Sequence, residues 1–259
     1  MSKQELLEDS LLSINTAVRM FLREDITRPY AACKNLGGFL WSLVGMYRCR
    51  AVLHFLLQAD VDGYFEDLHR GALTYLTLLK AYYQGFDVDR ARVNAYTDEP
   101  LLCAMAAGNF ELAHEIDVLM PKQLNGPDGQ EFLTYTNLLR ALASGDEPLT
   151  LRAFQEFQRT CTGKFRFDRD MAVLASLVHK DAAAFNKGLL EYLSLFDQLS
   201  PEEQQELDPG AGDIDIKALA LIQVARRAGV PLTVEHRMLP PELLEPRIRI
   251  PQDGYPAWP

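Results

Sequence analysis

Apolar residues recur every three or four positions along almost the whole chain, and this spacing limits the possible folds more than any other feature. Such a period is typical of amphipathic α-helices, whose apolar stripe packs against a core. The alternating pattern of half-buried strands is almost absent, since only residues 231–234 and 247–250 are β-like. The sequence therefore predicts an all-α fold.

The first third of the chain predicts three long helices. They cover residues 2–25, 30–59 and 64–84, and Pro29 and Asp62-Gly63 separate them. Two adjacent glycines, Gly37 and Gly38, lie inside the second of these helices. There they indicate either a kink or a point where another element packs closely.

After about residue 97 the pattern becomes repetitive. Four predicted helices stop at Gly108, Gly145, Lys180 and Gly229, where a glycine readily provides the left-handed residue that ends a helix. The spacings are 37, 35 and 49 residues, and the longest includes an acidic segment, 200–213, that looks like an inserted loop. A period near 35 residues is typical of stacked helical hairpins, although an ordinary bundle can show it by chance.

The first hairpin has clear starting signals for both of its helices. Residues 97–100 provide an N-cap residue, two acids and a proline, and Asn109 can cap the partner helix. We expect one helical domain over residues 1–245, with long helices in 1–95 and hairpins in 96–245.

An extended tail is expected over residues 246–259. Six prolines occur between Leu239 and Pro259, and this density argues against helix and for extended structure. Tyr255 and Trp258 are expected to anchor the tail on the body of the protein. The alternative is an exposed aromatic hook for a partner.

Charge and composition exclude several classes of protein. The chain has 26 Lys and Arg residues against 36 Asp and Glu residues, a net charge of −10, whereas nucleic-acid-binding proteins carry basic patches. The first 25 residues mix charges without an apolar signal region, and no run of 18 apolar residues follows. The four cysteines have no CxxC pair and no histidine at ligand spacing. We expect a cytoplasmic protein that contacts neither nucleic acid nor membrane directly.

Candidate catalytic patterns are weak. His114-Glu115 begins like the zinc motif HExxH, but Val118 stands where the second histidine is needed. His54, Asp67 and His69 could share a catalytic site, although the i, i+2 spacing of the last two directs them to different helix faces. No phosphate-binding loop or nucleophile elbow is present. We predict no enzyme activity, no catalytic residue, no metal and no cofactor.

Clusters of acidic residues stand out instead. They form either a solvated surface or a negative face that attracts and binds a positively charged protein. The candidate binding residues are Asp60, Asp62, Glu66, Asp67, Glu111, Glu115, Glu202, Glu203 and Glu206.

Two segments in the second half resemble a known family. Residues 172–196 (AVLASLVHKDAAAFNKGLLEYLSLF) and 213–245 (DIDIKALALIQVARRAGVPLTVEHRMLPPELLE) look like the bacterial polymorphic-toxin immunity proteins called immunity protein 49. The resemblance is clearest over about 171–245 and looser over about 60–170. The matching positions are Asp181, Phe185, Leu189, Leu190, Ala218, Leu219, Ala220, Ala225, Gly229, Val230, Pro231, Leu232, Val234, Leu239, Pro240 and Leu243.

The resemblance implies a protein that binds a cognate secreted antibacterial toxin, often a nuclease, and neutralises it by stoichiometric inhibition. Such a toxin is expected to be basic, and the family has no fixed catalytic motif to transfer.

Two other functions stay open. The first is a helical-repeat scaffold or adaptor, whose concave face would include Tyr135, Asn137 and Tyr192. The second is an enzyme that uses His54, Asp67 and His69. The oligomeric state is open too, because the apolar segment 39–44 could be core or a dimer seam, with core as the default.

Overall fold

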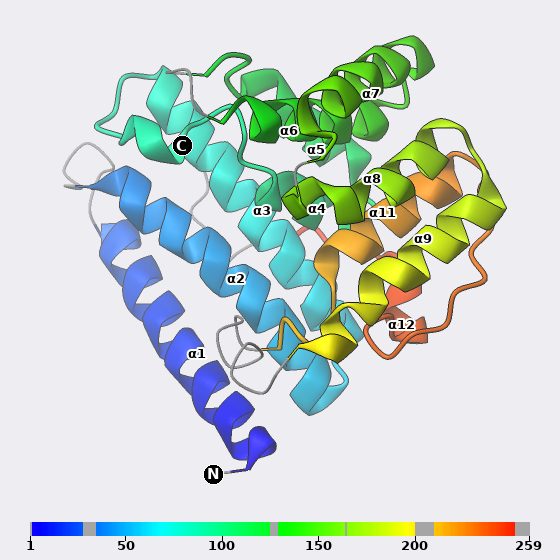
Figure 1. Ribbon diagram of the computed structural model, residues 1–259. Helices are drawn as coiled ribbons and strands as arrows, with labels where there is room; N and C mark the ends of the chain where they lie inside the picture. Colours follow the sequence, from blue (N-terminus) through cyan, green and yellow to red (C-terminus); the bar gives the residue numbers. More distant parts are fainter. Residues whose placement is uncertain (1, 28–34, 125–128, 164, 200–209, 252–259) are drawn as a thin grey trace.

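The computed structural model describes residues 2–27, 35–124, 129–163, 165–199 and 210–251, and in these ranges the chain is helical without any strand (Figure 1). The prediction of an all-α fold is confirmed. The two segments that seemed β-like, 231–234 and 247–250, have no regular secondary structure. No helix among the described residues combines the length and the hydropathy needed to cross a lipid bilayer.

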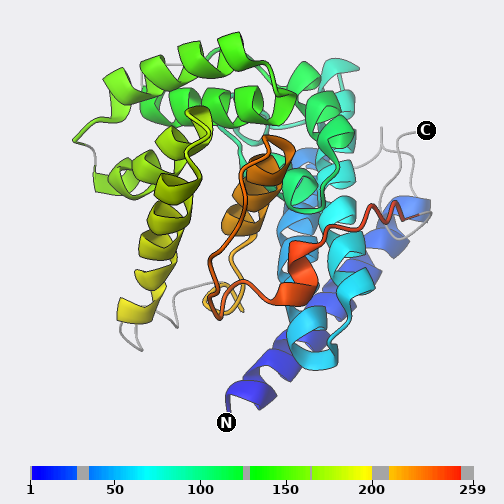
Figure 2. The ribbon, with the colours of Figure 1, turned by 90° about the vertical axis from the view of Figure 1, so that its right-hand side faces the viewer.

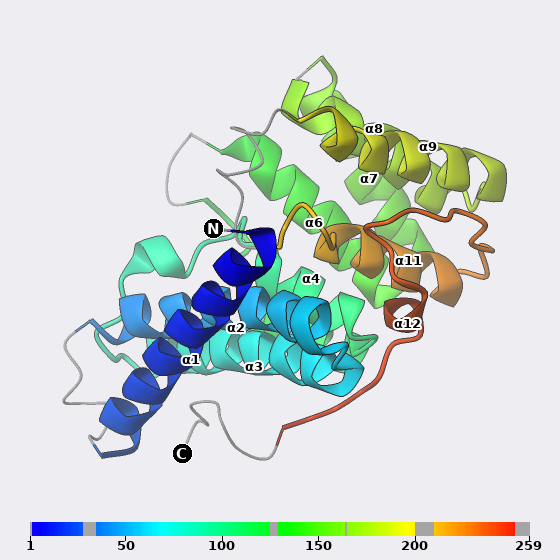
Figure 3. The same ribbon diagram turned by 90° about the horizontal axis from the view of Figure 1, so that it is seen from below.

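Three long helices lie next to one another at the N-terminal side of the molecule (Figures 1 and 3). They are α1 (Lys3–Thr27), α2 (Leu36–Gln58) and α3 (Val61–Tyr83). α2 packs against both of the others. Its Leu43 and Tyr47 are fully buried and form a small cluster with Val18 of α1. Because Leu40 and Val44 also lie in the core, the apolar segment of α2 is core, as expected.

The start of α2 differs from the prediction. The helix begins at Leu36 and not at residue 30, because Asn35 is left-handed and its side chain accepts a hydrogen bond from the Gly38 N–H (3.2 Å). The two glycines therefore lie in the first turn and produce no kink inside the helix. A Cβ atom on Gly37 would lie 2.8 Å from Val88 Cγ1, so this glycine permits close packing. Residues 30–34 lie outside the described ranges.

Three helical hairpins follow. They are α4 (Glu99–Ala106) with α5 (Phe110–Leu119), α6 (Gln130–Ser144) with α7 (Glu147–Cys161), and α8 (Phe165–Val178) with α9 (Ala182–Ser194). Successive hairpins are in contact through α5 with α6 and through α7 with α8. In Figure 1 the second hairpin lies at the top and the third at the right.

Short connections of three, two and three residues join the helices of the hairpins, and each ends with a left-handed residue followed by an N-cap. Gly108, Gly145 and Lys180 have left-handed backbones with φ of 72°, 74° and 54°. The next residue is in each case an N-cap whose side chain accepts a hydrogen bond from the N–H three positions on; these residues are Asn109, Asp146 and Asp181. The predicted helix ends are confirmed. Since Asp98 is the N-cap of α4, Thr97 does not cap that helix.

The fourth predicted stop is also correct, but its helix packs differently. α11 (Ile216–Arg227) ends before Gly229, whose φ is 76°. It packs against α4, and no other helix of the described residues forms a hairpin with it (Figures 1 and 2). Every residue from Pro100 to Ala106 and from Ala218 to Ala225 is buried. Helices that are buried all round occupy the centre of a fold, so α4 and α11 form the central pair of this one.

The proline-rich segment contains a helical turn that proline density had argued against. α12 (Pro241–Leu244) begins with a proline, and the first position of a helix needs no N–H donor. Residues 245–251 have no regular structure and run beside α3 (Figures 2 and 3), where Arg247 and Arg249 contact Asp62. Tyr255, Trp258 and the acidic segment 200–209 lie outside the described residues.

Candidate functional site

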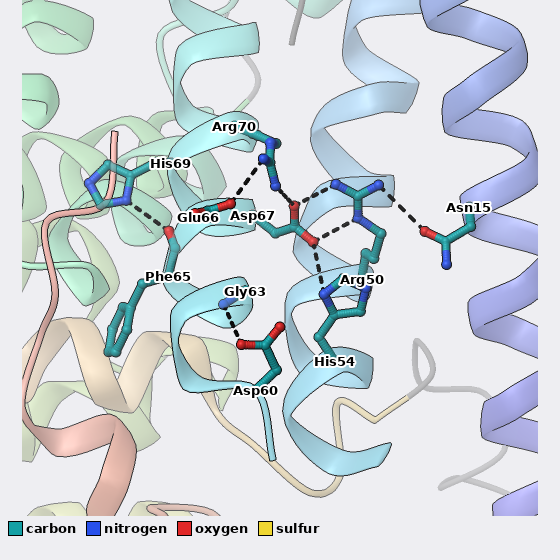
Figure 4. A network of polar contacts seen from close by, with 10 residues as sticks. All are labelled: Asn15, Arg50, His54, Asp60, Gly63, Phe65, Glu66, Asp67, His69 and Arg70. Atoms are coloured by element: carbon teal, nitrogen blue, oxygen red, sulfur yellow. Dashed lines mark hydrogen bonds and ion pairs between the residues drawn. The ribbon is translucent and has the colours of Figure 1, made fainter. Parts of the chain in front are cut away.

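Four of the acidic candidates lie at the start of α3, and the protein's own groups already bind them. Figure 4 shows three of the four, namely Asp60, Glu66 and Asp67. Asp60 caps the helix by accepting a hydrogen bond from the Gly63 N–H (2.8 Å). Glu66 pairs with Arg70 at 3.0 Å. Asp62 pairs with two arginines of the C-terminal segment, at 2.6 and 3.3 Å. The hydrogen bond from Arg247 is the main reason that the Asp62 pKa is lowered.

Asp67 is the centre of a buried network. Its side chain is 0% exposed. One oxygen accepts hydrogen bonds from Arg50 Nη2 (2.5 Å) and Arg70 Nη1 (2.8 Å), and the other accepts one from Arg50 Nε (2.7 Å). Arg50 also reaches Asn15 of α1 at 3.5 Å. Asp67 therefore ties α2 to α3 and has no surface with which to contact a partner.

The two histidines of the alternative catalytic site are not brought together. His54 Nδ1 lies 3.8 Å from the Asp67 carboxylate. His69 lies on another side of α3, where its Nδ1 is 2.7 Å from the Phe65 carbonyl oxygen (Figure 4). Burial is the largest cause that lowers the pKa of both imidazoles. Burial therefore favours the neutral imidazole at both positions. Asp67 and His69 lie on different sides of α3, as their i, i+2 spacing predicted.

The remaining acidic candidates differ in their surroundings. Glu111 and Glu115 lie on the exposed face of α5, and neither has an ion pair within the part of the chain that the structure describes. His114 and Val118 share this exposed face. In the described ranges no group of three His, Cys, Asp or Glu side chains could hold a metal ion. The other candidates, Glu202, Glu203 and Glu206, lie outside those ranges.

The structure contains a partly open cleft of about 600 Å³ that the acidic clusters did not indicate. It brings together residues from α2, α6, α8, α9 and α11 with the segment before α4. Tyr135 and Tyr192, which the scaffold hypothesis placed on a concave face, are in its walls, whereas Asn137 binds Arg140. The lining residues are Trp41, Asn94, Tyr96, Thr97, Asp98, Glu99, Phe132, Tyr135, Phe167, Arg169, Asp170, Tyr192, Leu195, Phe196, Leu199 and Lys217.

Most charges in this cleft are matched by a neighbour. Glu99 pairs with Arg48 at 2.5 Å, and Asp170 pairs with Lys217 at 2.7 Å. The Lys217 ammonium also lies 4.6 Å from the centre of the Tyr192 ring. Asp98 differs, because burial raises its pKa and no ion pair to its carboxylate is found among the described residues.

Comparison with known proteins gives one match. No curated protein and no solved structure matches the chain. The family model described as immunity protein 49 matches residues 44–243. This range runs from within α2 to within α12 and includes most residues that line the cleft, whereas α1 lies outside it. The chain therefore belongs to the immunity protein 49 family.

Proposed function

We propose that the protein binds a cognate secreted antibacterial toxin in the cytoplasm of the producing cell and neutralises it by forming a stoichiometric complex. Membership of the immunity protein 49 family is the observation that carries this proposal. The family supports an immunity role and a toxin partner. In this proposal the protein inhibits the toxin by staying bound to it, and it turns over no substrate.

The proposed partner is a basic protein, and a nuclease is the class that best explains this. A nuclease needs Lys and Arg side chains to bind phosphates, and an acidic protein competes for the same side chains. The chain has a net charge of −10. Charge of this sign steers a basic partner toward it and raises the association rate.

Among the acidic candidates, Glu111 and Glu115 are the strongest contact residues. They are exposed on a helix and make no ion pair among the described side chains, so a partner can bind them without displacing an internal cation. Asp62 and Glu66 are weaker candidates, because arginines of the protein itself already neutralise them. Asp67 is structural.

The test is co-expression with the product of the adjacent gene. We expect that the neighbour alone kills the host, that this protein relieves the killing, and that the two co-purify at a fixed ratio. A neighbour that is harmless and forms no complex would reject the proposed function for this pair.

A matched pair of variants locates the contact. The double substitution Glu111→Lys and Glu115→Lys should weaken the complex by about tenfold or more. The control is Glu5→Lys with Asp9→Lys on α1, which makes the same change in charge at exposed residues outside the family match. Equal weakening by both doubles would indicate net charge alone and remove α5 from the proposed interface.

A further inference from the structure

The cleft combines two features that together select a cation. Seven of its lining residues are aromatic, and the faces of aromatic rings attract positive charge. Its lining also includes three carboxylates, those of Asp98, Glu99 and Asp170, against the side chains of Arg169 and Lys217. Arg48, which does not line the cleft, neutralises Glu99, and Lys217 neutralises Asp170. Asp98 is therefore the carboxylate of the cleft that has no ion pair among the described residues.

The Asp98 carboxylate is available to a ligand. Although Asp98 is the N-cap residue of α4, its side chain makes no capping hydrogen bond, unlike Asp146 and Asp215 at the starts of α7 and α11. Arg48 pairs with Glu99 and Lys217 pairs with Asp170, so Lys217 acts on Asp98 through its charge without forming an ion pair with it. Burial penalises the ionised form and is the largest cause that raises the pKa of Asp98, although its own backbone N–H and the charge of Lys217 act in the opposite direction.

The cleft already holds one cation in the way that we infer for a ligand. Lys217 Nζ lies over the Tyr192 ring at 4.6 Å and pairs with Asp170 at 2.7 Å. An aromatic face and a carboxylate thus bind one ammonium group between them. Asp98 lines the same cleft as other aromatic side chains, such as Trp41 and Phe167, and its carboxylate makes no ion pair among the described residues.

We propose that this cleft is the site where an arginine side chain of the partner toxin anchors, with its guanidinium stacked on the aromatic walls and paired with Asp98. The inference rests on the proposed function. Arginine suits the site better than lysine, because its planar guanidinium stacks on rings and forms two parallel hydrogen bonds with one carboxylate. A volume of about 600 Å³ admits this side chain together with part of the segment that carries it. Buried arginines are frequent binding hot spots.

The first test needs no toxin. The chain has two tryptophans, Trp41 in the cleft and Trp258, so a Trp258→Phe background leaves Trp41 as the only fluorescent indole. The probes are the peptide acetyl-Gly-Arg-Gly-amide and the same peptide with citrulline, which has the shape of arginine without its charge. We expect the arginine peptide to change the fluorescence of Trp41 at millimolar concentration and the citrulline peptide to bind at least about tenfold more weakly. No response, or equal binding of both peptides, would overturn the proposal.

The second test uses Asp98→Asn. Because burial disfavours this carboxylate, its removal should leave the melting temperature unchanged or higher. A loss of binding would then not be caused by unfolding of the variant. The variant should lose at least about tenfold in affinity for the arginine peptide and for the toxin. Glu242→Gln is the control, because this carboxylate is exposed on α12 and does not line the cleft. Unchanged affinity of Asp98→Asn would overturn the proposal.

The two ideas can fail separately. If the wild-type protein binds no toxin but Trp41 reports arginine-selective binding, the proposed function is wrong and the cation site stands. If the toxin complex forms with full affinity in Asp98→Asn, the immunity role stands and the arginine site is wrong.

Discussion

Single carboxylates of similar sequence context have very different surroundings in this protein. Asp67 lies one position from Glu66, yet it is fully buried between two arginines whereas Glu66 reaches solvent. The sequence could not separate them, because Arg50 comes from another helix, 17 positions earlier. A cluster of acids in the sequence therefore predicted a negative patch where the structure has a largely neutralised one.

Replacing Asp67 should destabilise the fold. Asp67→Asn leaves Arg50 and Arg70 without their shared counter-ion, and breaking a buried pair in this way costs about 3–5 kcal/mol. Glu66→Gln is the control, since its carboxylate is partly exposed and its loss should cost little. Denaturant unfolding of both variants measures the difference. If the two variants were equally stable, the network would not hold α2 and α3 together.

His69, which is buried, and His54, which is partly buried, predict that the protein loses stability in mild acid. Burial lowers the pKa of His54 and His69 below their ordinary value of 6.5 in the folded state. The unfolded chain then binds more protons as the pH falls through that value, so the stability present above it is lost on acidification. We expect a lower free energy of unfolding at about pH 5.5 than at about pH 7.5. His69→Gln should show a smaller loss than the wild type, and an equal loss would contradict the role of His69.

At the level of elements, the sequence predicted where helices end, but it did not predict which helices pack together. The turns at Gly108, Gly145 and Lys180 follow from residues adjacent in sequence, namely a left-handed residue and an Asx cap. The predicted start of α2, at residue 30, was wrong because the N-cap at Asn35 interrupts a continuous apolar pattern. The helical turn at Pro241 was not predicted, because a high density of prolines argues against helix. A proline at the first position of a helix is nevertheless compatible with it.

Two glycines that end helices should differ in their tolerance of alanine. Both Gly108 and Gly229 have positive φ, so alanine should cost about 1 kcal/mol at either position. At Gly108 the added Cβ would also lie 2.8 Å from Pro246, whereas at Gly229 it meets nothing within 4 Å. Gly108→Ala should therefore be the less stable variant in denaturant unfolding, and should expose Arg247 and Arg249 to faster cleavage by trypsin. Equal stability and equal cleavage would show that Pro246 does not hold the tail there.

At the level of the whole molecule, the family was recognisable from sequence and the cleft was not. The segments that carried the resemblance form α8, α9, α11 and α12, where turns and core faces leave local patterns. The cleft is assembled from residues between Trp41 and Lys217 on separate elements, and only their packing brings the aromatic side chains together. Tyr135 and Tyr192 were identifiable as inner-face residues, but nothing in the local sequence of Asp98 distinguished it from other helix caps.

The kinetics of toxin binding should separate the charge of the molecule from the proposed arginine site. Exposed charges act mainly on association and are screened by salt, whereas a buried charge pair acts mainly on dissociation. Glu111→Gln with Glu115→Gln should lower the association rate and reduce its dependence on salt, with little change in the dissociation rate. Asp98→Asn should raise the dissociation rate by about tenfold or more at every salt concentration. Surface plasmon resonance between about 50 and about 300 mM salt measures both rates. An association rate that does not depend on salt would remove electrostatic steering from the proposed mechanism, and an unchanged dissociation rate in Asp98→Asn would remove the arginine anchor.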